Sequence, residues 1–262
     1  MRAPARRHLG KLVAGVALAA AGAAVAVGVS LPDDSAGDQA RAGSAQQDAV
    51  PPEGTVEAAP AEGEKGVGRD PLTDAEIARA EKLAENTDGF RLKSEDVEGD
   101  RGPQHLSTNL SEWDPTESGS SARQRRAEVV SYDYKNDATV TAVVNLDTGE
   151  VEDTQTDQGV QPPPVRDELA EATQLLIDSP LGAGLKDDYK DATGNALTTA
   201  DQLDVSGGVF RKETVENLPA GLKECGEHRC VRVAAKVKNG PWIDTRAFVV
   251  DLSDRGVARL DR

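Results

Sequence analysis

The stretch VVNLDTGEV, at residues 143–151, predicts the end of one strand, a tight turn and the start of another strand. A second stretch, VVDLSDRGV at residues 249–257, has the same order of two valines, a polar residue and a leucine. In both stretches a valine follows five residues after the leucine. Each copy ends a block that predicts one helix and then several strands. We therefore predict an α+β chain with a duplicated unit, one helix packed on an antiparallel sheet.

The first unit is predicted at residues 71–160. Thr73-Asp74-Ala75-Glu76 is a capping-box sequence, in which the Thr hydroxyl and the Glu carboxylate bind the first free amides of a helix. Apolar residues then recur at helical spacing as far as Asn86. Asn136-Asp137 and residues 147–149 predict turns. Strands are predicted at residues 106–113, 127–134, 139–146 and 151–156.

The second unit is predicted at residues 161–262. A triple proline at residues 162–164 breaks the chain, and a helix is predicted at residues 165–178. No helix or strand is assigned to the polar stretch that follows. Asn239-Gly240 is a strong signal for a two-residue hairpin turn. Strands are predicted at residues 205–215, 230–237, 242–251 and 257–260.

The N-terminal residues 1–31 have the pattern of an export signal. Arg6, Arg7 and Lys11 precede an uncharged run at residues 12–31. The paired arginines resemble a twin-arginine signal, and export by the general secretory route stays open. The apolar run is long enough to span a membrane, so two outcomes stay open: a cleaved signal of a secreted protein, or a retained anchor at residues 12–31.

Residues 32–70 are rich in Asp, Glu, Gly, Ala and Pro and have few large apolar side chains. Such a segment cannot bury enough apolar surface to offset the entropy of ordering. We predict a disordered linker.

The charge of the chain excludes one class of partner. It carries 46 Asp and Glu against 30 Lys and Arg, a formal net charge of −16. Nucleic acids and anionic membrane surfaces bind clustered Lys and Arg. We therefore expect no nucleic-acid partner, and membrane contact only through the N-terminal segment.

Cys225 and Cys230 are the two cysteines of the chain. An even pair in an exported protein predicts a disulfide, here one that closes a four-residue hairpin loop. The spacing is not that of the redox-active Cys-x-x-Cys pairs. A metal site needs more ligands than these cysteines and His228 supply.

No catalytic constellation is visible in the sequence. Outside the signal, the histidines are His105 and His228, and neither lies in a metal-binding motif. Nucleophile elbows, phosphate-binding loops and dinucleotide fingerprints are absent from the sequence as well. The basic cluster at residues 123–126 is interpreted as a polar lead-in to the next strand, with a proteolytic site or an anion contact as alternatives. We predict no catalytic, cofactor-binding or metal-binding residues, no cofactor, and no enzymatic activity.

These residues resemble a known family. PLTDAEI at residues 71–77, VVNLDTGEV at residues 143–151, and QPPP at residues 161–164 with the helix through Glu168 are similar to the small N-terminal domains of copper amine oxidases. The resemblance covers about residues 71–190. It implies two tandem cystatin-like units after the signal segment and linker. The family's catalytic domain, with its Asn-Tyr-Asp/Glu tyrosine and three copper-binding histidines, has no counterpart here.

Three functions follow as hypotheses. The first is an exported, non-catalytic module that binds a protein, a peptide or an envelope component, with the partner unknown. The second is an accessory or degenerate oxidase related to the amine oxidases, with copper or a quinone. The third is a structural protein of the cell envelope.

Overall fold

We analysed a computed structural model, which describes residues 63–112 and 124–261. All of these residues belong to one compact unit, Val56–Arg262. The predicted signal with Arg6, Arg7 and Lys11, the possible anchor at residues 12–31 and most of the predicted linker lie outside the described residues. Among the described residues, no helix combines the length and the apolar character needed to cross a membrane.

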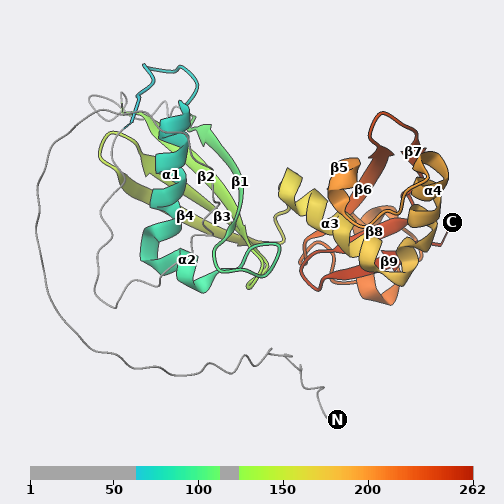
Figure 1. Cartoon of the computed structure of the whole chain (residues 1–262). Coiled ribbons are helices and arrows are strands. Elements are labelled where there is room, and N and C mark those ends of the chain that lie inside the picture. Colours follow the sequence, from blue (N-terminus) through green and yellow to red (C-terminus); the bar gives the residue numbers. More distant parts are fainter. Residues whose placement is uncertain (1–62, 113–123, 262) are drawn as a thin grey trace, which may run out of the picture. The chain divides into compact units, whose positions relative to one another are not determined.

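The first group of elements is a four-stranded antiparallel sheet with a helix on one face (Figure 1). The strands lie in the order β1-β2-β3-β4. The helix α1 is followed by a 3-10 turn and the short helix α2. The bounds are α1 Asp74–Asn86, α2 Phe90–Lys93, β1 Gln104–Leu110, β2 Arg126–Asp133, β3 Ala138–Asn145 and β4 Glu150–Gln158.

The capping box predicted for α1 is confirmed. The Thr73 hydroxyl accepts from the Glu76 amide at 3.2 Å, and the Thr73 amide donates to the Glu76 carboxylate at 2.9 Å. Ala80 and Ala84 of α1 pack on the sheet, and their small side chains let the helix lie close to the strands. The buried sheet residues of this core are Ala127, Val129, Ala142, Val144 and Leu146.

The second group is a five-stranded antiparallel sheet with two helices (Figure 1). Its main path is β5-β6-β8-β9, and β7 pairs with the other end of β6. The bounds are α3 Arg166–Asp178, α4 Ala183–Thr193, β5 Leu203–Val209, β6 Cys230–Val237, β7 Trp242–Ile243, β8 Phe248–Asp251 and β9 Gly256–Arg259.

Apolar clusters lie on both faces of the second sheet. Alternate residues of β6, Val231 and Val233 among them, face α3 and pack with Leu169 and Leu176 in the largest core. The opposite face carries a smaller cluster of Phe210, Leu222, Cys225, Cys230, Val249 and Leu260. The second sheet is therefore covered on both sides along part of its length.

The two copies of the repeated stretch have the same structure. In the first, β3 pairs with β4 through Val144↔Val151, and in the second β8 pairs with β9 through Val250↔Val257. The leucine of each copy is buried, and its amide donates to the carbonyl of an arginine just ahead of a strand. Leu146 binds Arg125 in this way at 2.8 Å, and Leu252 binds Arg229 at 2.9 Å. The predicted α+β class, with a helix on each antiparallel sheet, is confirmed.

Three predictions about elements were wrong in part. The strand predicted at residues 242–251 is two strands, because the Thr245 hydroxyl turns inward and donates to the Val233 carbonyl at 2.6 Å. The strand predicted at residues 205–215 ends at Val209, where a long connection with 3-10 turns begins. The polar stretch after α3 contains α4, whose apolar face consists of Leu185 and Tyr189, one turn apart.

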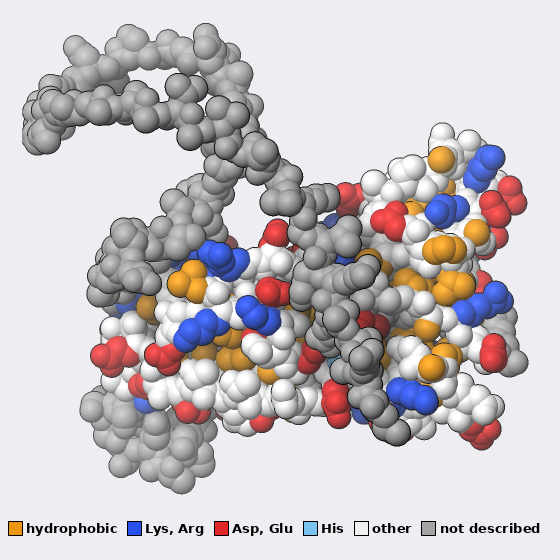
Figure 2. Space-filling model, turned by 90° about the horizontal axis from the view of Figure 1, so that it is seen from below, with side chains coloured by type: hydrophobic (Ala, Val, Ile, Leu, Met, Phe, Trp, Pro, Cys, Tyr) orange, Lys and Arg blue, Asp and Glu red, His pale blue; other side chains and the backbone are white. Residues whose placement is uncertain are grey.

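The surface has charges of both signs. On the face drawn in Figure 2, Asp and Glu side chains are interspersed with Lys and Arg and with apolar side chains. The excess of acidic residues therefore forms no single patch on the described part of that face.

Candidate functional site

The predicted disulfide between Cys225 and Cys230 is confirmed, with its Cα atoms 5.4 Å apart. Its setting differs from the prediction. Cys225 follows the 3-10 turn Ala220–Leu222 and is not part of a strand, whereas Cys230 begins β6. The bond therefore closes the turn that leads into β6, and does not connect two paired strands. Both cysteines are buried in the small outer cluster of the second sheet.

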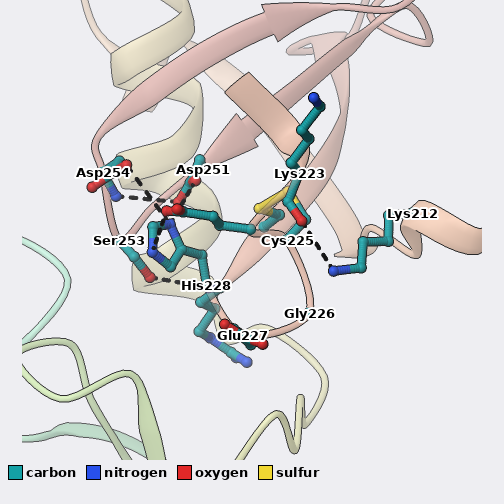
Figure 3. The surroundings of a disulfide bond; sticks show 12 residues. Lys212, Lys223, Cys225, Gly226, Glu227, His228, Asp251, Ser253 and Asp254 are labelled. Atoms are coloured by element: carbon teal, nitrogen blue, oxygen red, sulfur yellow. Dashed lines mark hydrogen bonds and ion pairs between the residues drawn. A yellow bond between two sulfur atoms is a disulfide. The ribbon is translucent and has the colours of Figure 1, made fainter. Parts of the chain in front are cut away.

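The loop that the disulfide closes holds His228 among four carboxylates. The Nδ1 of His228 is 3.0 Å from Asp251 and 3.8 Å from Asp254, and its Nε2 is 3.1 Å from Glu224 and 4.0 Å from Asp137. Figure 3 shows the imidazole beside Asp251 and Asp254, close to the disulfide. We call these five residues the His228 cluster. Asp137 lies in the turn between β2 and β3, so the cluster includes a residue of the first sheet.

Folding changes two pKa values in the cluster. Burial alone would lower the pKa of His228, but the hydrogen bond that its ring donates to Asp251 and the charges of Asp251, Asp137 and Asp254 raise it above its usual value. Burial raises the pKa of Asp137, opposed by hydrogen bonds and by His228. The cluster is therefore built to hold a proton on His228.

The same geometry gives a poor metal site. Glu224, His228 and Asp254 have potential ligand atoms within 4.8 Å of one another. A histidine binds a metal as neutral imidazole, so a raised pKa makes the proton compete with the metal. The sulfurs of Cys225 and Cys230, which lie near Asp251, are bound to each other. Both features weigh against metal binding at the His228 cluster.

A groove of about 570 Å³ lies on the first sheet, next to α2 and the C-terminal end of α1. It covers the part of the sheet beyond the last turn of α1. Its lining is mostly apolar or uncharged: Ala84, Thr87, Asp88, Phe90, Lys93, Val129, Ser131, Asp133, Asn136, Ala138, Val140, Ala142, Thr154, Thr156 and Gln158. We call it the β4 groove, because the last three residues come from that edge strand.

The titratable side chains of the β4 groove are Asp88, Lys93 and Asp133. Asp133 is buried, and it accepts hydrogen bonds from the amides of Glu95 and Lys135 and from the side chain of Asn136. Lys93 Nζ donates to the Asp88 carbonyl at 2.7 Å. The buried acid and the lysine both have structural partners, so the groove is suited to binding and offers no evident acid–base pair.

Strand β4 forms one wall of the groove and one edge of the sheet. All of its side chains are at least partly exposed. Thr154, Thr156 and Gln158 point toward the groove, and the alternate residues point to the other face. Its sequence, EVEDTQTDQ, contains four acidic residues. Among the described residues no strand pairs with its outer side, so β4 presents an acidic edge beside a mostly uncharged groove.

The residues singled out in the sequence lie in different places. His105 is in β1, where it contacts Thr108 and Glu81, and the His228 cluster does not include it. Within the basic cluster at residues 123–126, Arg125 is buried and bound to Glu76, so for this residue the interpretation as a polar lead-in was wrong. A basic residue ahead of a strand gives no sign in the sequence of such a distant partner.

The sequence analysis missed the four carboxylates of the His228 cluster. One signal was available for Asp251, because it occupies the position of Asn145 in the repeated stretch. Asn145 is buried and binds the amides of the turn after β3, at Asp147 and Thr148. Asp251 likewise binds the Asp254 amide, and its second oxygen remains for His228. The repeat thus indicated a buried polar residue, although not its histidine partner.

Comparisons with known proteins add a likeness of fold. No family model matches the chain, and no curated protein matches it. Among solved structures, the copper-containing benzylamine oxidase from Hansenula polymorpha matches 75% of this chain and 30% of its own, at 13% identity and a TM-score of 0.44. This chain therefore spans less than a third of the oxidase. Such values do not establish a shared activity.

Proposed function

We propose that this protein is an exported, non-catalytic interaction module, which binds an extended peptide segment of a partner protein at β4. The observation that carries the proposal is the open edge of β4 beside the β4 groove. A peptide that adds to a sheet edge gains main-chain hydrogen bonds, and its alternate side chains reach one face. Here that face holds the groove, so alternate residues of the peptide have a binding surface.

The acidic residues of β4 specify the charge of the peptide. Glu152 is bound to Arg126, so Glu150, Asp153 and Asp157 are the carboxylates that repel a second copy of the same strand, because charged edges oppose self-association. They attract an extended segment with Lys or Arg. The groove itself favours apolar or small polar side chains. We therefore propose a basic peptide in which apolar residues alternate with charged ones.

The test is a selection with a displayed library of random linear peptides on the mature chain. Enriched peptides are synthesised, and their affinities are measured for Thr154→Trp and Gln155→Trp. Thr154 lines the groove, whereas Gln155 is its exposed neighbour on the other face of β4. We expect Thr154→Trp to weaken binding about tenfold or more and Gln155→Trp to leave it within about twofold. Equal effects of both variants, or no enrichment of basic peptides, would reject the proposal.

Export is tested separately at the N-terminus. We propose the twin-arginine route for the signal with Arg6 and Arg7. Replacing both arginines with lysine keeps the positive charge but removes the pair. Retention of the variant inside the cell, with export of the unchanged chain, supports this route. Export of both chains assigns the general secretory route, and retention of both rejects export.

A further inference from the structure

Arg232 lies on the outer face of β6, since Val231 and Val233 on either side of it face the core under α3. Its guanidinium carbon is 5.2 Å from the centre of the Phe210 ring. Its Nε is shielded from solvent and has no hydrogen-bond partner among the described residues. Buried N–H groups in proteins are nearly always paired. Arg232 therefore has an unused donor beside an aromatic ring.

The side chain of Arg232 lines a pocket of about 710 Å³. The pocket is formed by the connection between β5 and β6, by the start of β8 and by the end of β9. Its other lining residues are Thr214, Val215, Glu216, Asn217, Arg246, Ala247, Leu260 and Asp261. We call it the Arg232 pocket. It lies on the second sheet, and none of its residues belongs to the β4 groove.

The second arginine of the pocket has a partner of its own. Arg246 forms two hydrogen bonds with Asp244, both at 3.0 Å, and its side chain is largely exposed. The pocket acids, Glu216 and Asp261, are exposed, and no ion pair connects either of them with Arg232 in the described residues. Arg232 thus has no ion-pair partner among the described residues, although the carboxylates of Glu216 and Asp261 line the same pocket.

We propose that the Arg232 pocket binds a small organic carboxylate. A guanidinium binds a carboxylate through two parallel hydrogen bonds, and partial burial strengthens them. Apolar side chains form part of the wall, at Val215, Ala247 and Leu260. They favour an anion with an apolar body over a fully hydrated inorganic ion. The side-chain amide of Asn217 adds an uncharged donor at the pocket, whereas the Thr214 hydroxyl donates to the Arg211 carbonyl at 2.7 Å. This site is separate from the peptide site proposed for β4.

The first experiment compares small anions by isothermal titration calorimetry at fixed salt. The probes are benzoate, its neutral analogue benzamide, and inorganic phosphate. We expect benzoate to bind and benzamide to bind at least about tenfold more weakly, because a hydrogen bond to a charged group is lost. Phosphate binding at Arg232 without benzoate binding would overturn the assignment to organic carboxylates. No binding of any anion would overturn the site.

The variant Arg232→Gln tests the residue, and Lys236→Gln is its matched control. Lys236 lies on the same face of β6, four residues along, with its ammonium 5.9 Å from the Trp242 ring and outside the pocket. We expect Arg232→Gln to weaken benzoate binding about tenfold to a hundredfold and Lys236→Gln to change it less than about twofold. Equal loss in both variants would mean a general charge effect and overturn the proposal.

A measurement on the unchanged protein keeps the test independent of folding defects in the variants. The Nε–H of Arg232 is shielded from solvent, so its nuclear magnetic resonance signal is expected to exchange slowly. We expect this signal to shift in a saturable way during a benzoate titration and to stay in place with benzamide. A benzoate titration that moves other signals but not this one would overturn the proposal.

Discussion

Glu168 and Arg229 form an ion pair in which both side chains are fully buried, although the residues are 61 positions apart. Arg229 Nη2 donates to Glu168 Oε2 at 2.8 Å, and Nη1 donates to the Pro162 carbonyl at 3.0 Å. The Tyr134 hydroxyl donates to the other Glu168 oxygen at 2.6 Å. The buried charges are therefore surrounded by hydrogen-bond partners, as burial of an ion pair requires.

The first group of elements contains a counterpart, Glu76 and Arg125. Arg125 Nε and Nη2 donate to the two Glu76 oxygens at 2.6 and 2.9 Å, and the guanidinium also binds the carbonyls of Gly68 and Pro71. In both pairs the glutamate is the third residue of a helix and the arginine directly precedes a strand. The likeness between the two groups of elements thus extends from the strand pattern to a buried ion pair.

Removing one partner of the buried pair should destabilise the protein strongly. We expect Arg229→Met to lower the free energy of unfolding by about 3–5 kcal/mol, because it leaves the Glu168 charge buried without its partner. The double variant Arg229→Met with Glu168→Leu should lose less of the free energy of unfolding, since neither buried charge remains. Urea unfolding measures this free energy for the single and the double variant. Arg246→Met, which breaks an exposed pair, is the control and should leave the free energy of unfolding nearly unchanged. A double variant less stable than the single one would contradict the explanation.

The pair with Glu76 should make stability depend on acid pH. Burial would raise the pKa of Glu76, but the hydrogen bonds from Arg125 and from the amides of Thr73 and Gly66, together with the Arg125 charge, lower it from 4.5 to about 2. A pKa lowered by folding means that the stabilisation is present above pH 4.5 and is lost as the pH falls toward 2.

Glu76→Gln tests this dependence by urea unfolding across that window. The variant should be less stable than the unchanged chain at neutral pH, and the difference should shrink as the pH falls. Glu98→Gln, at an exposed position, is the control and should follow the unchanged chain. A difference that stays constant with pH would show that the charge of Glu76 is not responsible.

The His228 cluster should stabilise the protein on the acid side of its titration. Folding raises the pKa of His228 above 6.5, so the stabilisation is complete below pH 6.5 and is lost as the pH rises through the folded-state pKa. Asp251→Asn removes the charge beside Nδ1 and keeps an oxygen for the Asp254 amide. We expect the titration midpoint of the His228 ring, followed by nuclear magnetic resonance, to fall in this variant. An unchanged midpoint would exclude Asp251 as the cause.

Loss of the disulfide should cost a moderate amount of stability. The residue separation of 5 encloses a short loop, for which the chain-entropy model gives about 2 kcal/mol. Replacing Cys225 and Cys230 with alanine avoids free thiols in the outer cluster. Urea unfolding of this variant and of the reduced, unchanged chain should give similar losses. A much larger loss in the alanine variant would indicate that packing of the sulfurs matters more than the crosslink.

Local signals predicted most of the helices and strands. Thr73 and Glu76 marked the start of α1 because capping depends on residues three positions apart. Asn239-Gly240 marked the turn after β6, and Asn239 has the positive φ of 57° that such a turn uses. Helix α4 was missed because its apolar face consists of Leu185 and Tyr189 alone, between glycines and acidic residues.

Long-range partners could not be predicted. Glu76 was recognised as a capping residue, but its pairing with Arg125 requires the sheet to bring residues 49 positions apart together. His228 was recognised as a lone histidine, and folding adds carboxylates from two distant segments, which hold Asp137 and the pair Asp251 and Asp254. The Arg232 pocket also depends on side chains from separate strands. Sequence spacing carries no information about these contacts.

The two buried ion pairs also have a consequence for the order of folding. Each requires closure of a long loop, of 49 or 61 residues, and these lengths differ in closure entropy by only about 0.2 kcal/mol. The entropic cost of loop closure therefore does not favour earlier folding of either half. The apolar cluster under α3 is larger than the one under α1, and most of its residues, though not Val97, come from the C-terminal half, so closure of that half buries more apolar surface. A refolding chain would then complete its C-terminal half first, opposite to the order in which a ribosome makes it.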